Sequence, residues 1–143
     1  MDKSPRADSK TGSCLCGAVK FEVTGPLRPV VACHCTQCRK QTGNYMSVTA
    51  VKDNYLTVTE ARGLKWYRSS DEARRGFCQD CGSTLFWKGE GRDYTAIAAG
   101  SIDGPLGVPL DGHIFCESAG DYYEMAGGNY RAPRSISHPE APE

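Results

Sequence analysis

The chain has 143 residues, its 17 lysines and arginines balance 17 aspartates and glutamates, and 39% of its residues are hydrophobic. This length suits one domain, and a net charge of zero removes the bulk attraction that proteins use to bind nucleic acids or anionic membranes. No run approaches the roughly 20 apolar residues that span a bilayer, and the polar N-terminus lacks the apolar segment of a signal peptide. We therefore predict a cytoplasmic protein without nucleic-acid or membrane partners, whose thiols stay reduced.

The ends of the chain are polar, which predicts a disordered lead over residues 1–11 and a flexible tail over residues 127–143, with one domain over residues 12–126 between them. Alternating and β-rich runs within the domain predict eight or nine short strands, among them residues 18–23, 46–51, 55–59, 64–67, 83–88, 94–98 and 113–116. Residues 52–54 are a candidate hairpin turn, and residues 39–43 form a short helix or a loop. The chain is therefore predicted to be mainly β.

Two pairs of cysteines at metal-ligand spacing lie far apart in the sequence. Cys14 and Cys16 form a C-x-C pair between glycines, and Cys78 and Cys81 form a C-x-x-C pair. Four thiolates fill a tetrahedral zinc shell, so we predict a structural zinc site that ties the first strand to a later hairpin. The alternatives are disulfides, which a reducing compartment disfavours, and a redox C-x-x-C pair, which the lack of alternating strands and helices disfavours.

A third cluster has three cysteines instead of four, namely Cys33, Cys35 and Cys38 in a C-x-C-x-x-C pattern. Three protein ligands leave one position of a tetrahedral zinc open, as in catalytic sites. The fourth ligand could be water or a substrate thiol, or it could be one of three side chains, His34, His113 and Cys116. Because its neighbours already bind the metal, His34 is expected to point away or to be hydrogen-bonded. For His113 we weigh a proton relay against a buried, satisfied histidine, and for Cys116 we expect an ordinary buried thiol on a strand.

Five motifs in this order resemble those of the glutathione-dependent formaldehyde-activating enzyme family, which shares a domain with centromere protein V. They are G-S-C-L-C-G, C-H-C-T-Q-C-R-K, F-C-x-x-C-G-S-x-L-F, A-G-S-I-D and H-I-F, running from Gly12 to Phe115. The resemblance covers most of the chain, to about Glu124. It implies a single domain of the Mss4-like fold, built from short antiparallel strands that zinc holds together.

The resemblance also implies two zinc ions per chain and a role for each cysteine cluster. Cys14, Cys16, Cys78 and Cys81 match the ligands of a structural zinc, and Cys33, Cys35 and Cys38 match those of a catalytic zinc. The implied activity is that of a carbon–sulfur lyase, which joins glutathione and formaldehyde to S-hydroxymethylglutathione.

The chemistry of an open three-cysteine zinc agrees with that activity, because coordination to zinc deprotonates a thiol. Arg39 and Lys40, beside the cluster, are candidates for contacts with the carboxylates of glutathione, although a solvated surface pair is the alternative. The competing functions are a non-catalytic, zinc-stapled protein-binding module and a nucleic-acid-binding zinc ribbon. The neutral charge and the lack of a basic stripe disfavour the zinc ribbon.

Overall fold

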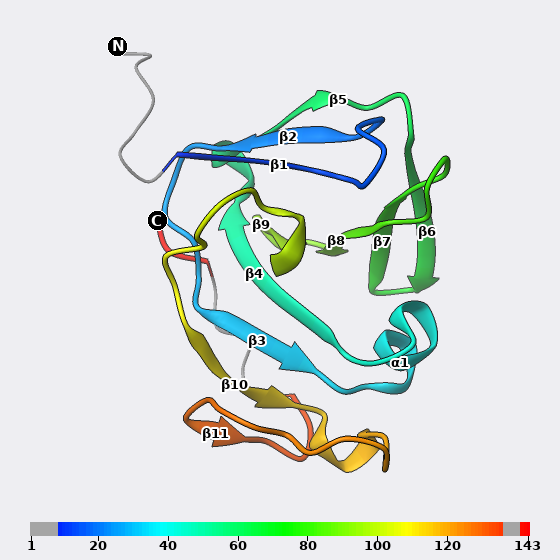
Figure 1. Cartoon of the computed structure of the whole chain (residues 1–143), viewed down its shortest axis with the longest axis vertical. Helices are drawn as coiled ribbons and strands as arrows, with labels where there is room; N and C mark the ends of the chain where they lie inside the picture. The colour runs from blue at the N-terminus through cyan, green and yellow to red at the C-terminus, as the bar shows by residue number, and fades with distance from the viewer. Residues whose placement is uncertain (1–8, 136–140) are drawn as a thin grey trace.

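A computed structural model of the chain describes residues 9–135 and 141–143, and in this part of the chain the fold is mainly β (Figure 1). The strands are β1 (Lys10–Ser13), β2 (Lys20–Val23), β3 (Val30–Cys33), β4 (Met46–Lys52), β5 (Leu56–Glu60), β6 (Leu64–Ser70), β7 (Ala73–Cys78), β8 (Thr84–Gly89), β9 (Tyr94–Ala98), β10 (Leu110–Ile114) and β11 (Tyr130–Arg131). One α-helix, α1 (Thr36–Thr42), and three 3-10 turns, η1 (Asp53–Tyr55), η2 (Ala99–Ser101) and η3 (Cys116–Ser118), connect them.

The strands form two sheets. A three-stranded sheet has the order β1-β2-β5, and an eight-stranded sheet has the order β11-β10-β3-β4-β9-β8-β7-β6. Neighbours are antiparallel, except that β10 pairs in parallel with both β3 and β11, which the expectation of antiparallel strands did not include. The described part of the chain holds no helix that could span a membrane.

The main core lies where the three-stranded sheet packs on the larger one. Phe21 of β2 meets Phe86 of β8 edge to face, with ring centroids 5.3 Å apart, and Val51 of β4 and Ile97 of β9 are fully buried in the same cluster. A second, smaller cluster around Met46 and Val48 of β4 lies on the opposite face of β4, together with Cys38. This explains why β4 is buried along nearly all of its length instead of alternating.

The proposed hairpin at residues 52–54 is wrong. β4 and β5 belong to different sheets, because β4 pairs with β3 and β9 whereas β5 pairs with β2. The turn η1 carries the chain from one layer to the other, and short β-rich runs do not reveal which neighbour each will choose.

The ends of the domain also differ from expectation. β1 starts at Lys10, two residues inside the proposed lead of residues 1–11, of which residues 1–8 lie outside the described part. In the tail from residue 127, Tyr130 and Arg131 form β11 against β10, and Ala141 is buried against Tyr94, while residues 136–140 lie outside the described part. These segments gain order from partners distant in sequence, which their polar composition does not show.

The end of β4 is tied to the start of β9 by a partly buried ion pair. Lys52 is 5% exposed, and its Nζ lies 2.8 Å from Oδ2 of Asp93. The hydrogen bond from Lys52 holds the pKa of Asp93 below its ordinary value. A carboxyl whose pKa is lowered on folding stabilises the fold above its unfolded pKa, near 4, and loses that contribution as the pH falls through the folded pKa.

We predict that Asp93→Asn lowers the thermal stability at pH 7, and that the difference from the parent protein shrinks as the pH falls below about 4. Thermal unfolding followed by circular dichroism between pH 3 and pH 7 measures this. Asp121→Asn, at an exposed position, is the matched control and should not reproduce the pattern. An Asp93→Asn effect that is the same at every pH would contradict the explanation.

Candidate metal centres

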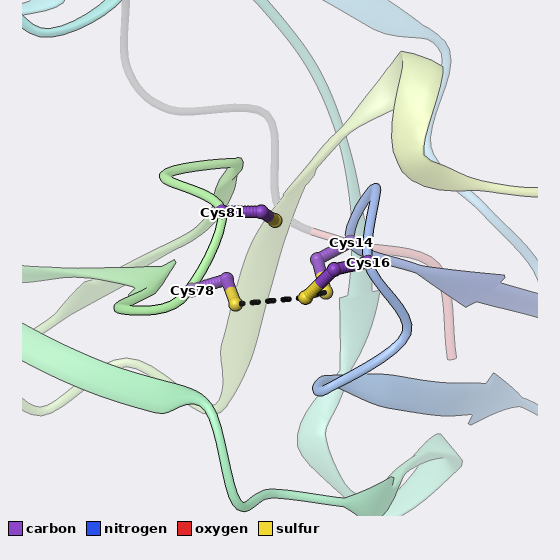
Figure 2. Close-up of side chains that lie close together, drawn as sticks. All are labelled: Cys14, Cys16, Cys78 and Cys81. Carbon is purple, nitrogen blue, oxygen red and sulfur yellow. Dashed lines mark hydrogen bonds between the residues drawn. The ribbon is translucent and has the colours of Figure 1, made fainter.

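Two loops from different sheets bring four cysteines together (Figure 2). Cys14 and Cys16 lie between β1 and β2, Cys78 is the last residue of β7, and Cys81 lies in the turn between β7 and β8. The four sulfur atoms are within 4.8 Å of one another. The Sγ atoms of Cys14 and Cys16 are 3.7 Å apart, and those of Cys16 and Cys78 are 3.8 Å apart. The predicted four-cysteine cluster is therefore confirmed as a group that could hold a metal ion.

The geometry fits a tetrahedral ion bound by thiolates. Zn–S bonds of about 2.3 Å place neighbouring sulfur atoms about 3.8 Å apart in a tetrahedron, which matches the distances of this cluster. A disulfide needs about 2.05 Å, and all eight cysteines are free thiols. The disulfide alternative is therefore not supported by the structure.

Ser83 joins the two loops at this four-cysteine centre. The backbone N–H of Leu15 donates to the Ser83 hydroxyl oxygen at 3.0 Å, and that hydroxyl lies 3.2 Å from Sγ of Cys81. Because its oxygen already accepts from Leu15, the hydroxyl proton is available for the sulfur, and this bond lowers the pKa of Cys81 to about 5. The N–H of Val19 donates in the same way to Sγ of Cys14 at 3.3 Å. Such contacts stabilise the thiolate form, which is the form that binds a metal.

Gly63, in the turn between β5 and β6, lies between the two loops. Its N–H donates to the carbonyl of Ala18 at 3.0 Å, and its own carbonyl accepts from the N–H of Gln79 at 2.7 Å. A Cβ at this position would lie 2.7 Å from Cβ of Ala18 and 2.9 Å from Sγ of Cys78. The four-cysteine centre therefore needs a residue without a side chain at position 63.

A second cysteine cluster forms where β3 runs into α1. The sulfur atoms of Cys33, Cys35 and Cys38 lie within 4.8 Å of one another, and within the described residues no fourth His, Cys, Asp or Glu ligand joins them. Cys33 ends β3, and Cys35 is the N-cap of α1, with its Sγ accepting from the N–H of Cys38 at 3.3 Å. Gly43 ends the helix with a left-handed backbone, φ 81°.

The three thiols act on one another electrostatically. The Cys33 and Cys38 thiols, with a smaller contribution from the Arg75 cation, lower the pKa of Cys35 to about 2. The pKa of Cys33 is raised, first because its own thiol donates to Cys35. The first thiolate thus forms readily, and its negative charge disfavours deprotonation of a second thiol. A bound divalent cation would offset this repulsion between the thiolates.

His34 is not a metal ligand, because both of its ring nitrogens are engaged elsewhere. Its Nδ1 lies 2.6 Å from the hydroxyl of Tyr123, and its Nε2 lies 2.9 Å from Nδ1 of His113. His113 Nε2 is 3.2 Å from the carbonyls of Ala126 and Gly127, which only accept. The proton positions follow: His113 donates from Nε2, His34 donates from Nε2 to His113, and Tyr123 donates to Nδ1 of His34.

This chain of hydrogen bonds shows that both histidines are buried and have hydrogen-bond partners other than the metal centre. His34 and His113 are 0% and 2% exposed, and burial, with the neighbouring His113, lowers the pKa of His34. At the His113 end the chain stops on backbone carbonyls, which cannot pass a proton on, so His113 is a buried, satisfied histidine. Cys116 is not on a strand as expected, because β10 ends at Ile114, Phe115 takes a left-handed backbone with φ 56°, and η3 follows.

A cavity of about 610 Å³ adjoins the three-cysteine cluster, and all three cysteines line it. Its apolar wall comes from Met46, Val48, Trp87 and Ala96. Its charged groups are three arginines, Arg28, Arg75 and Arg134, and two carboxylates, Glu72 and Glu117, of which Glu117 is paired with Arg134 at 2.9 Å. Tyr94 is 2% exposed, and its hydroxyl has no hydrogen-bond partner in the described structure. A group that needs both an apolar surface and cations would fit here.

The structure places Arg39 and Lys40 outside the residues that line this cavity. Arg39 donates from Nη1 to the carbonyl of Ser118 at 3.1 Å, and Lys40 is exposed. Their contact with glutathione stays a prediction. The arginine that lies against the cluster is Arg75, which sequence reasoning missed. The available signal was the Arg74-Arg75 pair within a strand, since alternation sends one of two adjacent side chains to each face.

The chain is similar to known proteins over most of its length. The sequence profile of the family described as glutathione-dependent formaldehyde-activating enzyme matches residues 9–118. An uncharacterized lyase of Schizosaccharomyces pombe is 27% identical over 117 residues, 80% of this chain and 84% of the relative. A candidate glutathione-dependent formaldehyde-activating enzyme of Halomonas elongata is 31% identical over 125 residues, 80% of this chain and 79% of the relative.

A solved structure is also similar to this chain. The crystal structure of a Rhodobacter sphaeroides protein matches with a TM-score of 0.58 and 26% sequence identity, over 70% of this chain and 98% of that one. The fold of the matched part of the chain therefore has an experimental counterpart.

We predict that Gly63→Ala lowers the free energy of unfolding by about 1–3 kcal/mol, because overpacking beside Ala18 and Cys78 forces the loops apart. Gly100→Ala is the matched control: this glycine is exposed, has open space where a Cβ would stand, and should change stability by less than about 1 kcal/mol. Urea unfolding of the metal-loaded proteins measures both. Equal stability of the two variants would show that the close approach at position 63 carries no cost.

We predict that Tyr123→Phe lowers the free energy of unfolding by about 1–3 kcal/mol, because it leaves the buried Nδ1 of His34 without its donor. The neighbouring Tyr122 is 58% exposed, so Tyr122→Phe is the control and should stay within about 0.5 kcal/mol of the parent protein. If both variants unfold alike, the hydrogen bond between Tyr123 and His34 does not stabilise the fold.

Proposed function

The chain belongs to the glutathione-dependent formaldehyde-activating enzyme family, and on that premise we propose that it is a zinc-dependent carbon–sulfur lyase acting on glutathione and formaldehyde. The observation that carries the proposal is the three-cysteine cluster without a fourth protein ligand in the described structure, opening on a cavity. A closed, four-ligand site would be structural, whereas an open one leaves a position for substrate. The names of the two relatives, a lyase and a candidate formaldehyde-activating enzyme, support the same class of reaction.

In this proposal the two cysteine clusters have different roles. Cys14, Cys16, Cys78 and Cys81 hold a structural zinc, and Cys33, Cys35 and Cys38 hold a catalytic zinc. A zinc ion at the second cluster supplies one chemical capability, which is to keep a thiol deprotonated at neutral pH. The residues of the chain then determine which thiol enters and how it is oriented.

The reaction itself is an addition to a carbonyl. The glutathione sulfur forms a bond to the formaldehyde carbon, the π electron pair of the C=O bond moves to oxygen, and that oxygen takes up a proton. The proton that left the thiol returns through solvent, so no net acid or base is consumed. The lyase direction reverses these steps and breaks the carbon–sulfur bond.

The cavity offers groups for the rest of the glutathione molecule. The apolar wall of Met46, Val48 and Trp87 displaces water from around the sulfur. Glutathione carries two carboxylates, and the cation Arg28 and the unpartnered hydroxyl of Tyr94 line the same cavity, where Arg134 is already paired with Glu117 at 2.9 Å. Arg28 and Tyr94 are therefore placed to receive a carboxylate. Arg39 donates to the carbonyl of Ser118, which lines the cavity, and its own contact with glutathione stays a prediction.

We predict that Cys35→Ser abolishes enzymatic exchange between free glutathione and its formaldehyde adduct, lowers bound zinc from about two ions per chain to about one, and leaves the fold intact. Exchange spectroscopy by NMR measures the rate above the uncatalysed background, elemental analysis measures zinc, and circular dichroism measures the fold. Cys116→Ser is the matched control, because Cys116 belongs to neither cluster, and it should retain zinc and activity.

Unchanged exchange in Cys35→Ser would contradict the proposal. A parent protein that binds zinc at both clusters yet gives no exchange above background would favour a zinc-stapled protein-binding module instead.

A further inference from the structure

The Arg75 side chain connects the larger sheet to the helix that carries the second cysteine cluster. Arg75 lies on β7, is 4% exposed, and donates from Nη1 to Oε1 of Gln41 at 2.8 Å and from Nη2 to Oε1 of Gln37 at 3.3 Å. Gln37 and Gln41 are four residues apart, so they lie on one side of α1. The guanidinium thus binds one side of α1 through the amide oxygens of two side chains.

The same guanidinium lies against a cluster sulfur. Its Nη1 is 3.5 Å from Sγ of Cys38 and 4.0 Å from Sδ of Met46. Its Nε is buried without a hydrogen-bond partner among the described residues, so hydrogen bonding by itself does not account for the burial of this cation. An uncompensated buried charge is expensive, and the cysteine cluster is the group beside it that can carry the opposite charge.

The charge of the centre explains what a buried cation would do there. Three thiolates and one divalent ion leave a formal charge of about −1, and a substrate thiolate brings it to about −2. In a partly buried site, each added negative charge weakens the binding of the next. A guanidinium in contact with one sulfur offsets one unit of this charge.

We propose that Arg75 is a positioning residue whose positive charge lets the three-cysteine centre retain a divalent metal ion and accept an anionic thiolate. The inference rests on the proposed function for the identity of that thiolate, but not for the charge balance. Arginine suits the role better than lysine, because its planar fork serves Gln37, Gln41 and Cys38 together.

The neighbouring residue provides an internal control. Arg74 points to the other face of β7, is exposed, and lies over the ring of Trp66 at 4.5 Å from its centroid. Arg74→Gln therefore removes the same charge from the same strand without touching the cluster.

The experiment uses the full chain loaded with Co²⁺, whose absorption reports on thiolate ligands, and compares Arg75→Gln, Arg75→Lys and Arg74→Gln with the parent protein. Glutathione is titrated into each, and a chelator is then added in steps. In Arg75→Gln we expect glutathione to bind at least about tenfold more weakly, and the three-cysteine centre to lose its metal at an at least about tenfold lower chelator concentration. Arg75→Lys should recover part of both losses, and Arg74→Gln should match the parent protein.

The four-cysteine centre reports on folding in every variant, because its metal should stay bound at chelator concentrations that empty the other centre. Arg75→Gln with parental metal retention and glutathione affinity would overturn the inference. Arg75→Lys as defective as Arg75→Gln would also overturn it, because charge would then not be the cause. A parent protein that binds metal and glutathione but shows no formaldehyde exchange would contradict the proposed lyase function. It would not contradict the role of Arg75, which concerns the binding of metal and thiolate.

Discussion

Two cysteine pairs separated by 62 residues along the chain meet at a single point, and the rest of the structure depends on this convergence. It closes a long loop and fixes the three-stranded sheet to the β7–β8 hairpin of the larger sheet. Gly63 permits the close approach of the two loops, and the Ser83 hydroxyl lies between them. Only 39% of the residues are hydrophobic, so apolar burial has little to spare for holding the two sheets together. The four-cysteine centre supplies an additional connection between the sheets.

Strand β7 connects the four-cysteine centre to the three-cysteine cluster. Cys78 at its end belongs to the main core, while Arg75, three residues earlier, pairs in register with Trp87 and lies against Cys38 on the cavity side. Residues three apart on a strand point to opposite faces, so one strand serves both centres. Interactions that hold the four-cysteine centre in place therefore also hold the Arg75 guanidinium in place beside the three-cysteine centre.

The three-cysteine cluster is held from the other direction by a buried polar network. His34, between two of its cysteines, has no freedom to bind a metal because Tyr123 and His113 occupy both ring nitrogens. The backbone N–H of His34 also donates to the carbonyl of Ile114 at 3.0 Å, which joins β3 to β10. The loop between Cys33 and Cys35 is thus fixed on one side by hydrogen bonds and open on the other to the cavity, as a site that exchanges ligands requires.

The sequence by itself determined the mainly β class and both cysteine clusters and indicated that His34 is a poor ligand, because ligand spacing and strand alternation are local properties. It did not determine the crossing from β4 to β5, the strands β1 and β11, or the lining of the cavity, because each depends on partners far away in the chain. Arg39 and Lys40 were chosen for proximity in sequence, whereas the tertiary structure places Arg75 against Cys38 by bringing β7 beside α1. Only folding decides which cation meets which sulfur, since charges act through space and not along the chain.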